Sequence, residues 1–215
     1  MADNYLEKRY EETLGASRPK VKSIGHTVDD LLLRNRSHRA FLSSYKVSRA
    51  ELERIVSVCS RIPSGCNRQA LRFHLLTYNT GGRELLPLIK LGAALPQLHL
   101  PLPNTEPEAF IICCATVDED RLIDIDLGIA LQSMMLKAVE MGLNALTIGA
   151  FNAEKVQKTF SIALRPLMIL AIGKGIDRIA LTSISPEQNH SYYRENGIHY
   201  VPKIVAEKLI LNHDA

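Results

Sequence analysis

Apolar residues along the chain follow helical spacing in some segments and form continuous runs in others. Leu52, Ile55, Val56 and Cys59 recur at the i, i+3, i+4, i+7 spacing of one helix face. This face follows the sequence Ser-Arg-Ala-Glu at 48–51, which is typical of a capping box. The pattern therefore predicts a one-sided helix that packs against a core.

A buried strand and a long central helix are the other strong elements. The uninterrupted apolar run at 109–116 is typical of a strand buried on both faces. The segment 124–143 reads as a helix, with Asp126 in its first turn and Gly142 at its end. Its polar residues indicate a core helix rather than a membrane span.

The remaining elements alternate irregularly along the chain. Further strands are predicted at 73–78, 144–148, 167–173 and 178–184, and further helices at 5–14, 27–39, 153–160 and 201–211. Residues 84–93 are compatible with a helix, whereas four prolines make 95–107 a loop. The absence of a repeated βαβ unit favours an α+β fold with a helix buried against the sheet.

Composition narrows the class of protein. A length of 215 residues suits a single domain over 1–215, and 46% hydrophobic with 23% charged residues is typical of a soluble globular chain. The net charge of +3 is too small to indicate nucleic-acid binding, and tryptophan is absent. For these reasons no nucleic-acid partner is expected. The charged N-terminal segment does not resemble a secretory signal, and no membrane partner is expected either.

The cysteines indicate inert thiols in a reducing compartment. Cys59, Cys66, Cys113 and Cys114 form no CxxC pair, and neighbours on a strand point to opposite faces. The seven histidines show no metal-binding spacing either. We therefore expect no metal site and a cytoplasmic location.

The segment 34–39 concentrates hydrogen-bond donors that match an anion. Arg34, Arg36 and Arg39 carry forked guanidinium groups, and Ser37 adds a hydroxyl. This set of donors predicts a phosphate site. The alternative is that the cations only stabilise the negative end of the helix dipole.

Two loops have residues suited to a flat heteroaromatic ligand. The loop at 63–69 is rich in small residues, and Asn67 and Gln69 offer both donors and acceptors. Gly149 follows a short strand, where its backbone N–H is free to bond a ring nitrogen. The alternatives are a helix stop at the first loop and a plain strand-to-helix turn at the second.

The C-terminal region has a hairpin turn and a candidate phosphate-binding lysine. Asn196-Gly197 is a strong turn signal, and Lys203 lies near the start of the helix predicted at 201–211. The alternative for Lys203 is an ordinary surface lysine.

Motifs for chemistry by protein side chains are missing from the sequence. The chain contains no GxSxG, HExxH, GxGxxG or P-loop motif. We therefore expect no catalytic side chain, so an enzyme of this sequence would rely on a cofactor.

Together these segments resemble the nitroreductase family of FMN-dependent oxidoreductases. The five matching motifs are Arg36-Ser-x-Arg-x-Phe41, Pro63-Ser-Gly-x-Asn-x-Gln69 leading into Arg72-Phe73, Asp124-Ile-Asp-Leu-Gly-Ile-Ala-x-Gln132, Gly142-Leu143 through Ile148-Gly-Ala-Phe151, and Ile172-Gly173 at the end of a strand. The tail from Tyr193 to Lys203 is also similar to members of the family. Each motif is weak alone, but five in the family's order form a specific pattern.

The resemblance implies a central, mostly antiparallel sheet flanked by helices in a domain-exchanged homodimer, with FMN at the subunit interface. The residues implied at the ribityl phosphate are Asn35, Arg36, Ser37, Arg39 and Lys203. Those implied at the flavin from the other subunit are Pro63, Ser64, Gly65 and Asn67. The resemblance also implies that Gln69 meets the flavin or ribityl chain, Ile148 and Gly149 lie along the ring, and Lys90 lies near its carbonyl edge.

The activity implied by the resemblance is hydride transfer from NAD(P)H, through flavin N5, to an electron-poor acceptor such as a nitroaromatic or quinone. A pocket shared by the two substrates implies ping-pong kinetics. One alternative is a flavin-binding storage or sensing protein with little reductase turnover. Another is a dimeric structural protein whose arginines serve only helix ends.

Overall fold

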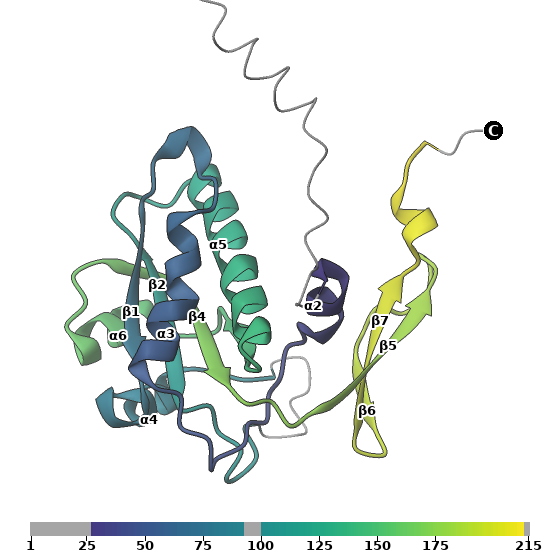
Figure 1. Cartoon of the computed structure of the whole chain (residues 1–215), viewed down its shortest axis with the longest axis horizontal. Coiled ribbons are helices and arrows are strands. Elements are labelled where there is room, and N and C mark those ends of the chain that lie inside the picture. Colours follow the sequence, from purple (N-terminus) through teal and green to yellow (C-terminus); the bar gives the residue numbers. More distant parts are fainter. Residues whose placement is uncertain (1–26, 93–99, 213–215) are drawn as a thin grey trace, which may run out of the picture.

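The computed structural model describes residues 27–92 and 100–212, so the helix predicted at 5–14 lies outside the described residues. Its main sheet has four antiparallel strands in the order β1-β2-β4-β3 (Figure 1). Their bounds are β1 Leu71–Leu76, β2 Ala109–Ala115, β3 Asn144–Ile148 and β4 Arg165–Gly173. The expected α+β class with a mostly antiparallel central sheet is confirmed.

Helices cover both faces of this sheet. On one face α3 (Arg49–Val56) and α5 (Arg121–Glu140) form a core with alternate residues of the strands. On the other face α4 (Gly82–Leu85) and α6 (Ala153–Phe160) close a second core. Every residue of β2 is buried, and each large apolar side chain buried in this way contributes about 1.5–3 kcal/mol.

The predicted inert pair of thiols lies on β2 at the centre of these layers. Cys113 packs in the core under α5, and Cys114 packs in the core under α6. Burial raises the pKa of Cys114 to about 11 and raises that of Cys113 further. The prediction that the two side chains point to opposite faces is confirmed.

Side-chain caps define the starts of the helices. The side chains of Thr27 and Ser48 cap α2 (Val28–Arg34) and α3, each in a reciprocal capping box. Asn152 caps α6 by accepting a hydrogen bond from the backbone N–H of Lys155. These predicted caps are confirmed, because they depend on residues only three positions apart.

The predicted start of α5 at Asp124 is wrong by three residues. The helix begins at Arg121, because the Asp120 carboxylate accepts a hydrogen bond from the Ile123 backbone N–H at 2.9 Å. The helix ends at Glu140, three residues before the predicted end, and Asp126 lies in its second turn rather than its first. The predicted stop at Gly142 is confirmed, since this residue has a left-handed φ of 76° just beyond the last turn. No helix among the described residues is long and apolar enough to cross a membrane.

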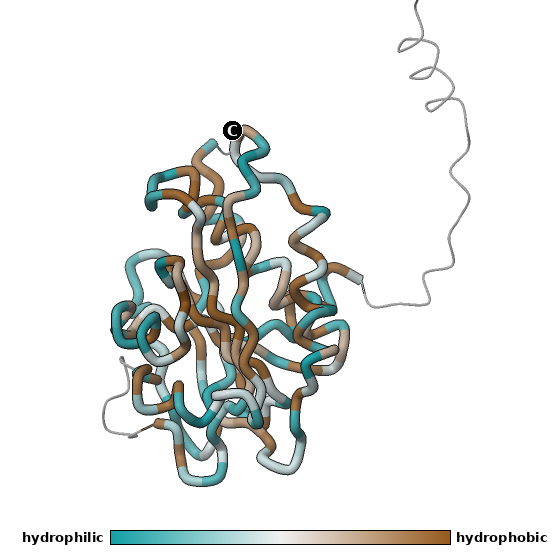
Figure 2. The backbone as a smooth tube through the Cα atoms, turned by 90° about the vertical axis from the view of Figure 1, so that its left-hand side faces the viewer, coloured by the Kyte–Doolittle hydropathy of each residue, from teal (hydrophilic) through white to brown (hydrophobic). Residues whose placement is uncertain are grey.

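A second sheet forms an arm beside α2, apart from the main sheet (Figure 1). Its strands are β5 (Arg178–Ile184), β6 (Tyr193–Glu195) and β7 (Ile198–Ile204), in the order β5-β7-β6. The predicted turn at Asn196-Gly197 joins β6 to β7, and both turn residues have positive φ. Figure 2 shows hydrophobic residues concentrated along the strands in the middle of the molecule.

The helix predicted at 201–211 is wrong. Residues through Ile204 form β7, which pairs in parallel with β5, for example Thr182 with Pro202. Proline and β-branched residues fit an extended ladder better than a helix interior. The possible helix at 84–93 is also shorter than expected, since α4 ends at Leu85. The short 3-10 turns are η1 Ser57–Ser60, η2 Gly65–Asn67, η3 Tyr78–Thr80, η4 Leu86–Leu88 and η6 Ala206–Leu209.

Replacing Ser48 by alanine should lower the free energy of unfolding by about 1 kcal/mol, because α3 loses its side-chain cap. Urea unfolding at a fixed protein concentration measures this change. Ser43→Ala is the matched control, since Ser43 lies in an exposed turn. Equal stabilities of the two variants would contradict the role of the cap.

Candidate functional site

A cavity of about 300 Å³ lies between the segment after α2, the helix α5 and the arm. It is lined by Asn35, Arg36, Ser37, Arg39, Gln132, Met135, Ile179, Tyr192, His199, Val201 and Lys203. Every residue that the resemblance implied at a phosphate is among them. The fold thus brings Lys203 from the end of the chain to the segment 35–39.

The segment 35–39 is not helical, so the prediction of a helix over 27–39 is wrong for its last five residues. α2 ends at Arg34, and Ser37 forms a parallel bridge with Ala145 of β3. The Arg36 guanidinium donates to the Leu32 carbonyl at 2.6 Å, so it stabilises the end of α2 as well as lining the cavity. The two interpretations of this arginine, helix end and anion site, are therefore compatible.

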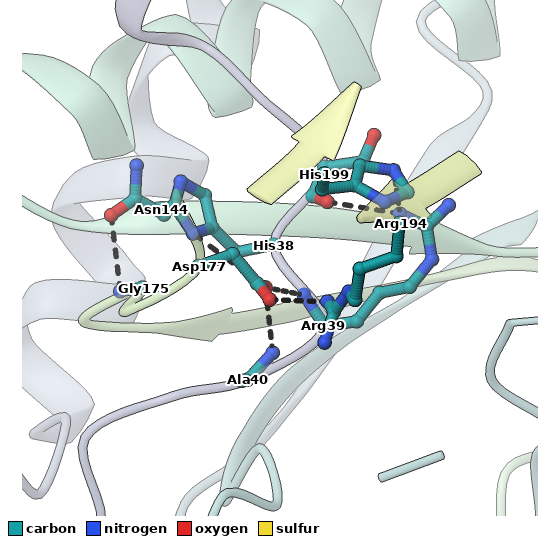
Figure 3. A network of polar contacts seen from close by, with 9 residues as sticks. His38, Arg39, Ala40, Asn144, Gly175, Asp177, Arg194 and His199 are labelled. Carbon is teal, nitrogen blue, oxygen red and sulfur yellow. Dashed lines mark hydrogen bonds and ion pairs between the residues drawn. The ribbon is translucent and has the colours of Figure 1, made fainter. Parts of the chain in front are cut away.

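The carboxylate of Asp177 holds this segment to the arm (Figure 3). One of its oxygens accepts hydrogen bonds from the backbone N–H groups of Arg39 at 2.6 Å and Ala40 at 2.9 Å. The other oxygen accepts from the Arg194 guanidinium of β6 at 2.6 Å. Because the Asp177 side chain is only 6% exposed, these bonds replace the water it loses.

Arg39 is oriented by side chains of the arm. Its guanidinium lies over the Tyr192 ring, 4.9 Å from the centroid, and 3.4 Å separates its Nη1 from Nε2 of His199. Burial, together with Arg39 and Arg194, lowers the pKa of His199, and Asp177 opposes this shift. A neutral imidazole can accept a hydrogen bond from Arg39. The His199 ring and the Tyr192 ring then orient the guanidinium.

His38, in the same segment, packs against the backbone at Gly175. Its Nδ1 lies 3.9 Å from the nearer Asp177 oxygen, while burial lowers the pKa of the ring more than Asp177 raises it. A Cβ on Gly175 would lie 2.3 Å from this ring, so the close approach requires glycine. The Gly175 backbone N–H in turn donates to the Asn144 side chain at 3.0 Å, as Figure 3 shows.

Three buried polar atoms in the cavity wall have no partner among the described residues. They are Asn35 Oδ1, Arg36 Nε and His199 Nδ1. The other side of the Asn35 amide donates to Gln132 at 3.4 Å, which fixes the direction of its free oxygen. Buried polar groups are normally hydrogen-bonded, so this wall suits a ligand with both acceptors and donors.

A second cavity of about 320 Å³ lies at the loop predicted to meet a flat ligand. Its lining residues are Val56, Ser57, Cys59, Ser60, Ile62, Pro63, Ser64, Gln69, Ala70, Leu71, Arg72, Phe73, Asp126 and Ala130. Of the residues implied at the flavin, Pro63, Ser64 and Gln69 line this cavity. Gly65 borders it through a hydrogen bond of 2.8 Å from its N–H to Asp126.

The loop that borders this cavity has a strained backbone. Cys66, Asn67 and Gln69 have φ angles of 51°, 52° and 47°, which are uncommon for residues other than glycine. The Gln69 amide donates to Asn67 Oδ1 at 3.0 Å, and its backbone N–H donates to Ser64 Oγ at 3.2 Å. Such conformations cost about 1–3 kcal/mol each and cluster at functional sites.

The remaining expected residues lie outside both cavities. Ile148 packs in the core under α6, and Gly149 is exposed just beyond β3. Lys90 is near them, because its backbone N–H donates to the Ala150 carbonyl at 2.9 Å. Gly149 lies four positions after Ala145, the partner of Ser37, which is about 13 Å of extended chain.

Sequence reasoning did not assign roles to Asp177, Arg194, His199 or Asp126. Arg194 and His199 fall within the tail motif, and Asp126 falls within the helix motif, but Asp177 carries no local signal. Among residues 27–92 and 100–212, no cluster of His, Cys, Asp and Glu could hold a metal ion.

Comparison with known proteins defines the class. The family model of the nitroreductase family matches residues 32–174. A nitroreductase family protein from Clostridium difficile is 25% identical, with a TM-score of 0.57 over 70% of this chain and 85% of that one. A comparison with curated protein sequences finds no match.

Two further structures share the fold. A proposed nitroreductase from Exiguobacterium sibiricum, in complex with FMN, is 21% identical, with a TM-score of 0.58 over 71% of this chain and 90% of that one. A proposed NAD(P)H:FMN oxidoreductase from Staphylococcus epidermidis is 19% identical, with a TM-score of 0.55 over 70% and 87%. Because the family model covers more than half of the sequence, this chain belongs to the nitroreductase family.

Asp177→Asn should lower the free energy of unfolding by about 3 kcal/mol, because it leaves the Arg194 charge without its buried partner. Urea unfolding measures the loss. Glu53→Gln is the control, since it breaks an exposed ion pair with Arg49 and should cost less than about 0.5 kcal/mol. A similar small effect of both changes would show that Asp177 does not anchor the segment.

Proposed function

We propose that this member of the nitroreductase family is an FMN-dependent oxidoreductase. The observation that carries the proposal is the cavity where Arg36, Arg39 and Lys203 converge with Ser37. Three cations and a hydroxyl around one cavity match a phosphate group. The FMN complex from Exiguobacterium sibiricum supports the same cofactor.

The buried polar atoms that lack a hydrogen-bond partner in the cavity wall are of the kinds that FMN could satisfy. Arg36 Nε is a buried donor without a partner among the described residues, and a phosphate oxygen would accept from it. Asn35 Oδ1 is a buried acceptor that also lacks a partner among the described residues, and a ribityl hydroxyl would donate to it. Burial also lowers the pKa of Arg36, so pairing with an anion would offset the cost of its desolvation.

When bound, FMN would supply hydride transfer at N5, from NAD(P)H to an electron-poor acceptor such as a nitroaromatic or quinone. The residues of this chain would bind and orient the cofactor. Arg36, Ser37, Arg39 and Lys203 would hold its phosphate, and the Gly149 N–H would donate toward the ring. No acidic or basic side chain is required, which agrees with the lack of a catalytic motif.

We further propose that the chain acts as a homodimer with an exchanged arm. α2 has no buried residue, and Val28 and Leu33 are 65% and 63% exposed. Leu181 and Tyr193 are also exposed on the arm. Apolar surface of this kind is suited to burial against a second copy, which would bring the 63–69 loop of one subunit to the phosphate cavity of the other.

The double change Arg36→Ala and Arg39→Ala should weaken FMN binding roughly 100-fold, because two charge-assisted hydrogen-bonding groups are lost. Titration of the flavin-free protein with FMN, followed by fluorescence, measures the affinity. The pair Arg54→Ala and Arg83→Ala removes the same charge at exposed positions and is the control. Unchanged FMN affinity in the first variant would refute the phosphate site.

Anaerobic NADH or NADPH should bleach the absorbance of the FMN-loaded protein, and a nitroaromatic or quinone should restore it. Steady-state rates at several acceptor concentrations should then give parallel double-reciprocal lines, as ping-pong turnover requires. A bound flavin that neither nicotinamide reduces would favour the storage or sensing alternative. Intersecting lines would contradict a shared pocket.

A further inference from the structure

Two buried imidazole rings lie where the arm meets the body, which comprises the main sheet, its helices and the segment 35–39. His199, on β7 of the arm, is 3% exposed, and His38, in the segment 35–39, is 8% exposed. Both belong to the polar network around the Asp177 carboxylate (Figure 3). A titratable ring that is buried at a contact between two parts of a protein makes that contact sensitive to pH.

The hydrogen bond from Arg39 fixes the position of the proton on the His199 ring. A guanidinium has only donors, so Nε2 of His199, 3.4 Å from Arg39 Nη1, accepts, and the proton of the neutral ring lies on Nδ1. Nδ1 is buried and has no partner among the described residues. A second proton, on Nε2, would point at the guanidinium, so neither N–H of the charged ring would have an acceptor there. The contact between β7 and the segment 35–39 therefore requires the neutral ring.

The cations around the His199 ring oppose a further positive charge. Arg39 contacts the ring, and Arg194 lies opposite His199 in the ladder of β6 and β7. Two more cations, Arg36 and Lys203, line the same cavity as the ring. From the side of α5, the residues that line this cavity are the uncharged Gln132 and Met135.

The carboxylate of Asp177 offsets these charges only in part. Its oxygens already accept hydrogen bonds from the Arg194 guanidinium and from the backbone N–H groups of Arg39 and Ala40. Burial, Arg39 and Arg194 together lower the pKa of His199, although Asp177 acts in the opposite direction. The closed junction thus holds a neutral ring between two guanidinium groups.

His38 has the same preference for the neutral form on the other side of the junction. Its ring packs against the backbone at Gly175, and its Nδ1 is buried without a hydrogen-bond partner among the described residues. The nearer Asp177 oxygen is 3.9 Å away and raises the pKa of His38, but burial lowers it more. Both rings therefore take up a proton more readily once the junction loosens and water reaches them.

We propose that the arm is held to the body by a proton-sensitive contact, in which the neutral His199 ring accepts a hydrogen bond from Arg39 and protonation loosens the junction. In the loosened form the ring meets water, where the pKa of histidine is about 6.5. That form binds the proton more tightly, so the contact is at full strength above about pH 6.5 and weakens as the pH falls below it. The arm supplies a wall of the cavity beside the segment 35–39, so the same loosening widens this cavity.

Nuclear magnetic resonance on the flavin-free full chain tests this contact. The nitrogen shifts of the His199 ring should show a proton on Nδ1 at about pH 8 and a midpoint of protonation below about 6.5. The backbone amides of Arg39 and Ala40 donate to Asp177 across the junction, so their hydrogen exchange, corrected for the intrinsic rate, reports its opening. Their opening constant should rise by up to about tenfold per pH unit for each ring that takes up a proton. The amides of β2 in the core should keep their protection.

His199→Gln is the decisive variant, because its amide oxygen can accept from Arg39 and the side chain takes up no proton in this range. The pH dependence of the opening constant should lose one proton, which is up to about tenfold per pH unit. His190→Gln is the matched control. His190 is exposed in the connection between β5 and β6, so this change should leave the dependence unaltered.

Several results would overturn the role of His199. They are a charged ring at neutral pH, a neutral ring with its proton on Nε2, amide exchange at Arg39 and Ala40 without a pH-dependent opening, and the same dependence in His199→Gln. The first three are measured on the unchanged chain and do not require the variant to fold. Because no flavin is present, none of these results depends on whether the chain binds FMN.

Discussion

The candidate site depends on the hydrogen bonds around the Asp177 carboxylate. This side chain, one residue before β5, fastens the backbone at 39–40 to the base of the arm and pairs with Arg194 of β6. The pairing also offsets the positive charge of Arg194. The cations that line the cavity are Arg36, Arg39 and Lys203. A buried carboxylate is stable in this place only because N–H donors replace its lost water.

The helix α5 organises both cavities. Gln132 lines the cavity beside the segment 35–39, and Asp126 lines the second cavity. Six residues separate these positions, which corresponds to about 9 Å along the helix axis and about 240° around it. The two cavities thus use different sides of α5, which is compatible with the proposal that a second copy completes each site.

The strained backbone of the loop at 63–69 fits a ligand-binding role. It holds three residues other than glycine at positive φ. Strain of this kind persists only where surrounding contacts fix the conformation. Hydrogen bonds within the loop and the bond from Gly65 to Asp126 supply that constraint.

Local sequence determined the caps at Ser48 and Asn152 and the turn at Asn196-Gly197, because each depends on residues a few positions apart. The donor-rich segment 35–39 was also recognisable, since its chemistry lies in consecutive residues. Tertiary structure decided that 201–204 is a strand, because pairing with β5 selects the extended form. It also decided the roles of Asp177 and Asp126, whose partners Arg39 and Gly65 are 138 and 61 residues away, beyond the reach of any local pattern.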